Sequence, residues 1–159
     1  MGSIFVNENK QLKLTNALEI QIDLSDEKAE PGIVMEKIQS YIRVKGTQQV
    51  GPLVQYMFLD KEKSGNEGIV MKFIVQTATY IHSIEKPYRM ESVIRVPNCM
   101  YCRYIGPEEK LKFAYDKINL EAFENDIELA GESYTVFVDQ NEEEGTIVAD
   151  VFMPKAKDE

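Results

Sequence analysis

The chain has 159 residues, of which 43% are apolar and 28% are charged, a balance typical of a folded globular protein. Its 27 acidic and 18 basic residues give a formal net charge of −9, which repels the phosphate backbone of nucleic acids. The sequence has no run of about 18 apolar residues and no basic start followed by a long apolar stretch. We therefore expect a cytoplasmic protein that neither spans a membrane nor binds nucleic acid directly.

The first part of the chain has the pattern of a strand, a helix and two further strands. Apolar and polar residues alternate over residues 18–24, as in a half-buried strand. A helix is predicted after Pro31, because apolar residues recur at helical spacing until Gly46. Two apolar segments, 53–60 and 67–75, flank a charged turn and predict a β-hairpin.

The second part of the chain shows the same order of elements. Residues 98–105 are strand-like, and Gly-Pro-Glu-Glu at 106–109 is typical of a helix start, with acids near the positive end of the helix dipole. We expect this helix to extend to about Ile127. Segments 133–139 and 144–153 then repeat the hairpin pattern of an apolar strand, Asp, a charged turn, Glu-Gly and a second apolar strand.

The two similar halves predict an α+β fold within one domain, residues 1–159. It consists of two pseudo-symmetric strand-helix-strand-strand modules with antiparallel sheets and a helix packed on each. The first module covers residues 10–76 and the second covers 90–154. Residues 77–89 form the connection, and His82 is interpreted as a histidine of this linker.

The only two cysteines, Cys99 and Cys102, are three residues apart. Residues at this spacing on an extended strand point to opposite faces, so these two thiols cannot jointly bind a metal or form a disulfide. A zinc site also needs four ligands, and His82 is the only histidine. We interpret the cysteines as packing residues and expect no metal or other cofactor.

The last predicted strand carries an acid, Asp150, beside Phe152. The opposite face of the strand is apolar and is expected to pack on the helices: Ile147, Ala149, Val151 and Met153. A carboxylate beside aromatic rings suits a cationic or polarised ligand, which gains both Coulomb attraction and cation-π contact. The alternative is an ion pair of Asp150 with Lys72 or Arg103, because a partly buried acid needs a partner.

The segments "YCRYIGPEEKLKFAYDKI", "NDIELAGESYTVFVD" and "TIVADVFMP" resemble the GyrI-like, or effector-binding domain, superfamily. This superfamily includes ligand domains of bacterial AraC-type and MerR-type regulators and free-standing proteins. The shared pattern is clearest from Val93 to Pro154, with Gly-Pro between a strand and a helix and a closing strand of acid, apolar, aromatic, apolar and proline. The resemblance implies a groove between two modules that takes small cationic or aromatic ligands. No helix-turn-helix precedes residue 1, so we expect a free-standing branch.

The resemblance also implies which residues contact the ligand. Asp150 matches the acid of the closing strand and Phe152 its aromatic position, where the family more often has glutamate and tyrosine. Four further residues are predicted to line the groove: Tyr56, Tyr101, Arg103 and Tyr134. The predicted function is small-molecule binding without catalysis, because no acid–base pair or activated nucleophile is legible. A regulatory module that binds a basic protein partner is the alternative, suggested by the −9 charge.

Overall fold

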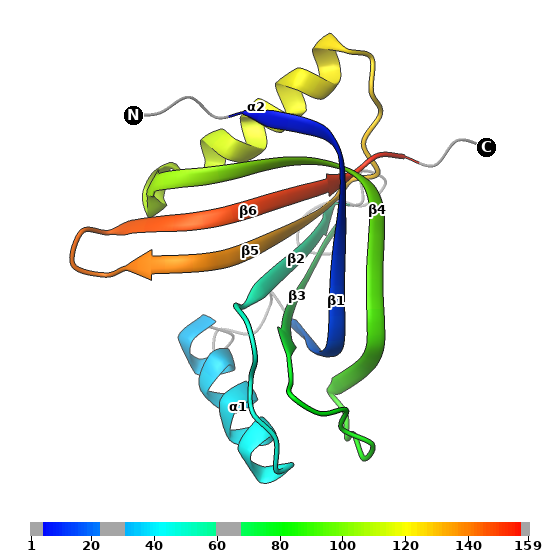
Figure 1. Cartoon of the computed structure of the whole chain (residues 1–159), viewed down its shortest axis with the longest axis vertical. Coiled ribbons are helices and arrows are strands. Elements are labelled where there is room, and N and C mark those ends of the chain that lie inside the picture. Colours follow the sequence, from blue (N-terminus) through cyan, green and yellow to red (C-terminus); the bar gives the residue numbers. More distant parts are fainter. Residues whose placement is uncertain (1–4, 23–30, 60–67, 157–159) are drawn as a thin grey trace. The chain divides into compact units, whose positions relative to one another are not determined.

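The computed structural model describes residues 5–22, 31–59 and 68–156 of the chain (Figure 1). Among these residues, none of the helices is long and apolar enough to cross a membrane. The elements in chain order are β1 (Val6–Ile22), α1 (Pro31–Val44), β2 (Val54–Leu59), β3 (Ile69–Gln76), β4 (Tyr88–Pro107), a 3-10 turn (Glu108–Lys110), α2 (Lys112–Glu124), β5 (Glu132–Asn141) and β6 (Thr146–Pro154).

One compact unit consists of Lys13–Ile94. In this unit β3 pairs antiparallel with both β1 and β2. Helix α1 places one apolar stripe against the sheet, because its buried residues recur at spacings of four. The central core residues are Leu18 of β1, Val34, Ile38 and Ile42 of α1, and Phe73 and Val75 of β3.

The second compact unit combines Met1–Leu12 with Arg95–Glu159. Here β6 pairs antiparallel with both β4 and β5, and α2 lies along this sheet (Figure 1). The predicted apolar face of the last strand is confirmed, since its residues form one core with the helix. This core contains Met100 and Cys102 of β4, Ala114, Ile118 and Ala122 of α2, and Ile147, Ala149, Val151 and Met153 of β6.

Backbone hydrogen bonds of the same kind recur in the two units. The amide of Thr77 donates to the carbonyl of Asn16 at 3.0 Å, and the amide of Lys155 donates to the carbonyl of Asn98 at 3.1 Å. Both asparagines have a positive φ, 47° for Asn16 and 56° for Asn98. Each therefore marks a point where a long strand, β1 or β4, departs from extended geometry.

The predicted helix after Pro31 is confirmed as α1, and the strands of both predicted hairpins are confirmed as β2, β3, β5 and β6. The turn of the first hairpin and the end of the first predicted strand, residues 23 and 24, lie outside the described residues. The predicted module boundaries at 10–76, 77–89 and 90–154 stay a prediction.

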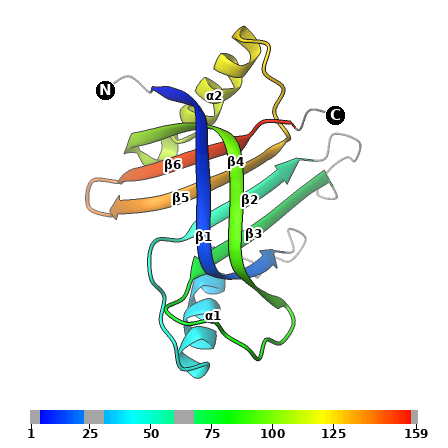
Figure 2. The same ribbon diagram turned by 45° about the vertical axis from the view of Figure 1, so that its right-hand side comes forward.

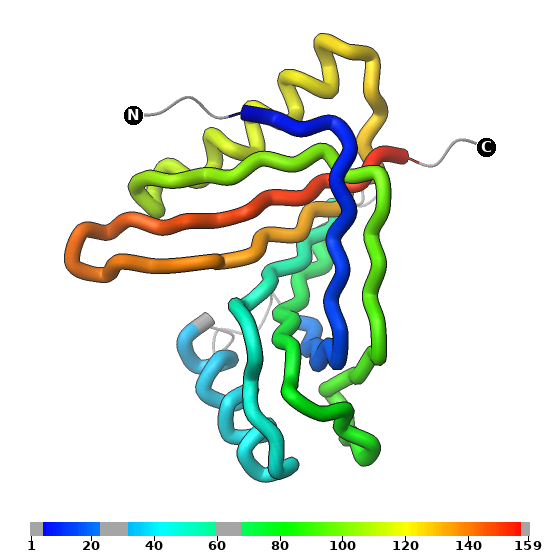
Figure 3. The backbone as a smooth tube through the Cα atoms, in the orientation of Figure 1, coloured from blue at the N-terminus to red at the C-terminus, as the bar shows by residue number. Residues whose placement is uncertain are grey.

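The predicted fold class was wrong. The chain is mostly antiparallel sheet, and hydrogen bonding joins the strands into one barrel in the closed order β1-β3-β2-β5-β6-β4 rather than into two separate α+β modules. The reason lies in β1 and β4, which have 17 and 20 residues and run without a break through both units (Figures 2 and 3). Residues 7–11 of β1 are polar and exposed, and the apolar residues at the start of β4 are at most half-buried, so the sequence did not indicate the full length of either strand.

Candidate functional site

Both cysteines are fully buried and free, which confirms that they are packing residues. The Sγ of Cys102 faces α2, 3.8 Å from the carbonyl oxygen of Ala114, whereas the Sγ of Cys99 lies 3.3 Å from the carbonyl oxygen of Val96. Burial raises the pKa of Cys99 to about 11 and that of Cys102 to about 12, so neither thiol is an activated nucleophile.

Asp150 is held by two side chains of the neighbouring strand β4. The antiparallel register places Arg103 directly opposite Asp150. The guanidinium binds the carboxylate in a bidentate way, with Nε 2.8 Å from Oδ1 and Nη2 3.0 Å from Oδ2. The Tyr101 hydroxyl donates a further bond to Oδ1 at 2.9 Å. The ion-pair alternative is therefore confirmed with Arg103 as the partner.

Exposure differs across this ion pair. The Asp150 side chain is 14% exposed, while that of Arg103 is 49% exposed. The carboxylate raises the pKa of Arg103 further, through the hydrogen bonds and the opposite charge. Burial raises the pKa of Tyr101, and its hydrogen bond to Asp150 adds to this shift. At neutral pH the site thus contains a fixed cation and a neutral phenol that donates its proton to the acid.

Aromatic rings flank the carboxylate. Tyr101 lies opposite Phe152 in the β4–β6 register, and their ring centroids are 4.9 Å apart. The Nζ of Lys10 lies 5.3 Å from the centroid of the Tyr101 ring. We call Asp150, Arg103, Tyr101 and Phe152 the Asp150 cluster. Sequence reasoning named all four members but missed Lys10, although Leu12 and Leu14 alternate with exposed polar residues directly after it.

The two remaining predicted residues differ in how they relate to the Asp150 cluster. Tyr134 is buried on β5, opposite Phe152 in the β5–β6 register. Tyr56 belongs to the other unit, where the Nζ of Lys72 lies 5.4 Å from the centroid of its ring. Lys72 itself lies 4.0 Å from a carboxylate oxygen of Glu19. A role of Tyr56 and Tyr134 in the site stays a prediction.

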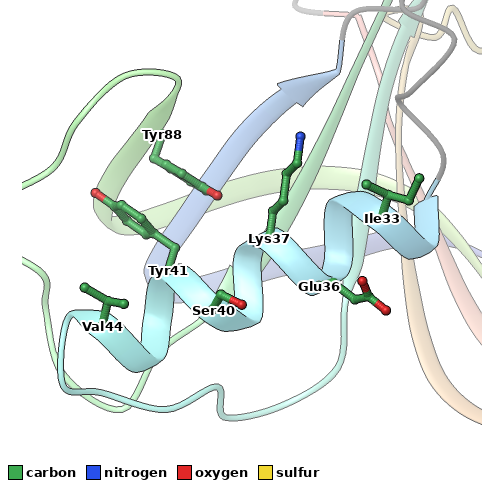
Figure 4. Close-up of a pocket in the computed structure, with 7 residues that line it drawn as sticks. All are labelled: Ile33, Glu36, Lys37, Ser40, Tyr41, Val44 and Tyr88. Atoms are coloured by element: carbon green, nitrogen blue, oxygen red, sulfur yellow. The ribbon is translucent and has the colours of Figure 1, made fainter.

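A second candidate site lies on α1 and was not indicated by the sequence. It is an open pocket of about 530 Å³, which Figure 4 shows in close-up. We call it the α1 pocket, and its lining residues are Ile33, Glu36, Lys37, Ser40, Tyr41, Val44 and Tyr88. Sequence reasoning missed it because Tyr88 lies in the segment that was interpreted as a connection.

The stacked rings of Tyr41 and Tyr88 form one wall of the α1 pocket, with centroids 3.9 Å apart and planes 13° apart. The Tyr41 hydroxyl donates to the carboxylate of Glu85, and the Glu85 amide donates back to that hydroxyl at 3.1 Å. The Nζ of Lys45 binds the same carboxylate at 2.7 Å. Hydrogen bonds from Lys45 and Tyr41 lower the pKa of Glu85, which therefore stays charged and keeps Tyr41 in place.

No protein-family model matches this chain, and no curated protein matches it either. Solved structures do match. The C-terminal domain of EcmrR is 13% identical with a TM-score of 0.70, and the match covers 98% of each chain. EcmrR in a DNA complex is 14% identical with a TM-score of 0.68, and the match covers 98% of this chain and 58% of that one. The chain thus spans less than two thirds of the longer protein.

More distant matches include two further proteins. A hydrolase from Listeria innocua is 9% identical with a TM-score of 0.53, and the match covers 94% of this chain and 92% of that one. SAV2435 bound to tetraphenylphosphonium is 9% identical with a TM-score of 0.51 and 94% coverage of both chains. At these identities the likeness shows a shared fold, consistent with the GyrI-like fold that the sequence resembles.

Proposed function

We propose that this chain is a non-enzymatic small-molecule-binding module, and that the Asp150 cluster is part of its binding surface for an organic cation. The observation that carries the proposal is a carboxylate with only 14% of its side chain exposed, beside the rings of Tyr101 and Phe152. A cation–π contact with such rings contributes about 0.5–2 kcal/mol. SAV2435, which shares the fold, is bound to an aromatic cation, and this supports the ligand class.

A non-catalytic role fits the contacts of Asp150. Among the described residues, its hydrogen-bond partners are Arg103 and Tyr101 alone. A carboxylate that already accepts three hydrogen bonds is poorly placed to activate a water molecule as a general base. The exposed His82 lies in the other unit, with its ring 5.0 Å from that of Tyr80. One solved structure with the same fold is a hydrolase, but the Asp150 cluster of this chain contains no acid–base pair, and a shared fold alone does not imply a shared activity.

Thermal unfolding with tetraphenylphosphonium tests the proposal. A ligand at about 100 times its dissociation constant should stabilise the protein by about 2.7 kcal/mol. Asp150→Asn should lose most of this gain, because the neutral amide attracts no cation. Glu19→Gln is the matched control, since Glu19 is also a shielded acid that faces a cation, at 11% exposure, but lies in the other unit.

Two results would contradict the proposal: no stabilisation of the unaltered protein at any attainable ligand concentration, or equal stabilisation of Asp150→Asn. The alternative function, binding of a basic protein partner, still depends on the net charge alone and stays a prediction.

A further inference from the structure

We propose that the α1 pocket is a separate ligand site and that it takes small aromatic carboxylates. All of its lining residues belong to the unit Lys13–Ile94, whereas the Asp150 cluster belongs to the other unit. Its volume of about 530 Å³ falls in the range of about 300–1,000 Å³ that is typical of small-molecule sites. The two sites can therefore be tested independently.

The aromatic part of the ligand is inferred from the apolar wall. Tyr41 is fixed by Glu85 on one side, and Tyr88 stacks on it, so the wall is formed before any ligand binds. Beside it, Val44 is 82% exposed and Ile33 is 39% exposed. These two side chains are about 16 Å apart along α1, so a flat ring would cover one of them while it lies against a rigid aromatic surface, which favours binding at a small entropic cost.

The carboxylate of the ligand is inferred from two hydrogen-bond donors. Within the described part of the chain, neither Lys37 nor the hydroxyl of Tyr88 has an ion pair or a hydrogen bond, unlike Lys45, which is neutralised by Glu85. Figure 4 shows the Tyr88 hydroxyl pointing toward Lys37, whereas the Tyr41 hydroxyl points the opposite way. An ammonium and a phenol on the same side of α1 suit an anion that accepts two bonds.

The one acid that lines the pocket does not oppose this arrangement. In Figure 4 the side chain of Glu36 points to the other side of α1 from Lys37 and Tyr88. The carboxylate of Glu85 is already bound by Lys45 and Tyr41. The charged residues that line the pocket are thus Lys37 and Glu36, and only Lys37 lies on the side of α1 where Tyr88 lies.

The test is a titration of the whole ¹⁵N-labelled chain with 2-naphthoate and with its neutral analogue 2-naphthylmethanol, followed by amide NMR shifts. Naphthoate should shift amides of α1 and around Tyr88 in a saturable manner. Lys37→Gln should weaken the binding of naphthoate about threefold to fivefold, which is the effect of losing one exposed ion pair, and should leave the affinity for naphthylmethanol unchanged. Lys112→Gln is the matched control, because Lys112 also lies near a ring, 5.7 Å from the centroid of Phe113 on α2.

Two variants of Tyr88 separate the ring from its hydroxyl. Tyr88→Leu should weaken the binding of both probes. Tyr88→Phe, which keeps the stacked ring, should weaken the binding of naphthoate alone. The proposal is overturned if naphthoate shifts no amides of α1, or if Lys37→Gln and Lys112→Gln change its affinity equally. Tetraphenylphosphonium binding is measured on the same samples, so failure of this proposal is distinguishable from failure of the cation site.

Discussion

At the residue scale, Arg103 binds the same Asp150 carboxylate that an organic cation would have to contact. Its guanidinium forms two bonds to Asp150, yet half of its side chain is exposed to solvent. For the arginine to move aside, both of these charge-assisted hydrogen bonds to a shielded carboxylate must break, which costs more than breaking a fully exposed ion pair. Arg103 therefore acts as an internal competitor that sets how strongly an external cation must bind.

Removing this competitor should tighten cation binding. We expect Arg103→Gln to lower the dissociation constant of tetraphenylphosphonium about tenfold, as the loss of one charged hydrogen-bonded partner implies. Isothermal titration calorimetry measures this change. Arg95→Gln, an exposed arginine on the same strand, controls for the change in net charge. If Arg103→Gln instead weakens binding, Arg103 positions the carboxylate rather than competing for it.

The buried thiols give a second prediction at this scale. With pKa values raised to about 11 and about 12, Cys99 and Cys102 stay protonated in the folded protein where unfolded thiols, with a pKa of about 8.5, ionise. Their contribution to the free energy of unfolding is thus fully present below about pH 8.5. It is lost as the pH rises toward the pKa values of the two thiols in the folded protein. Urea unfolding between pH 7 and pH 10 should show this fall.

Tyrosines that titrate in the same range also affect stability, so the comparison must isolate the thiols. Cys102→Ala should make the free energy of unfolding fall less steeply above about pH 8.5 than in the unaltered chain. A thiol reagent such as Ellman's should react slowly with the folded chain at pH 8 and rapidly in denaturant. Fast labelling of the folded protein would show that the thiols are not buried as described.

At the element scale, the bends in β1 and β4 fix how these long strands run. Asn98 has a φ of 56°, a region that valine strongly disfavours and glycine adopts freely. We expect Asn98→Val to lower the free energy of unfolding by about 1–2 kcal/mol and Asn98→Gly to have little effect. Urea unfolding provides the measurement. Glu91→Val, at an exposed position of the same strand, should cost little, and an equal loss there would contradict the argument.

The same strands explain how far the sequence could predict the fold. Alternation is visible where one face is buried, as in β6, and there the elements and their apolar faces were predicted correctly. Between Tyr88 and Pro97 most residues are exposed, and the alternating residues Tyr88, Met90, Ile94 and Val96 are only half-buried, so a strand was predicted only from residue 98. The closed sheet depends on such segments, and this is why the predicted class was wrong.

The sites show a similar limit. The Asp150 cluster could be predicted because a carboxylate and a ring two residues apart share one face of a strand. Whether Arg103 or Lys72 would pair with the acid depended on the register of β4 against β6, which no pattern in the sequence specifies. The stacking of Tyr88 on Tyr41 joins residues 47 positions apart along the chain, and no local spacing indicates such a contact.

At the scale of the whole molecule, the net charge and the local charges have different signs. The chain carries −9, but the Asp150 cluster and Lys10 together contain two cations and one acid, and the α1 pocket is lined by one cation, Lys37, and one acid, Glu36. Long-range attraction of an organic cation must then come from the field of the whole chain rather than from the groups it touches. For an aromatic carboxylate the long-range field is repulsive and the local contact is attractive.

These opposite contributions predict different salt dependences for the two ligands. Raising the ionic strength from about 0.01 M to about 0.1 M shortens the Debye length from about 30 Å to about 10 Å, so the distant charges of the chain are screened first. Tetraphenylphosphonium binding should weaken severalfold, whereas naphthoate binding should change little, because repulsion and attraction are screened together. Titrations of both ligands across this range measure the difference, and 2-naphthylmethanol corrects for salt effects on the ring. Equal weakening of both charged ligands would mean that local pairs, and not the net charge of the chain, govern binding at both sites.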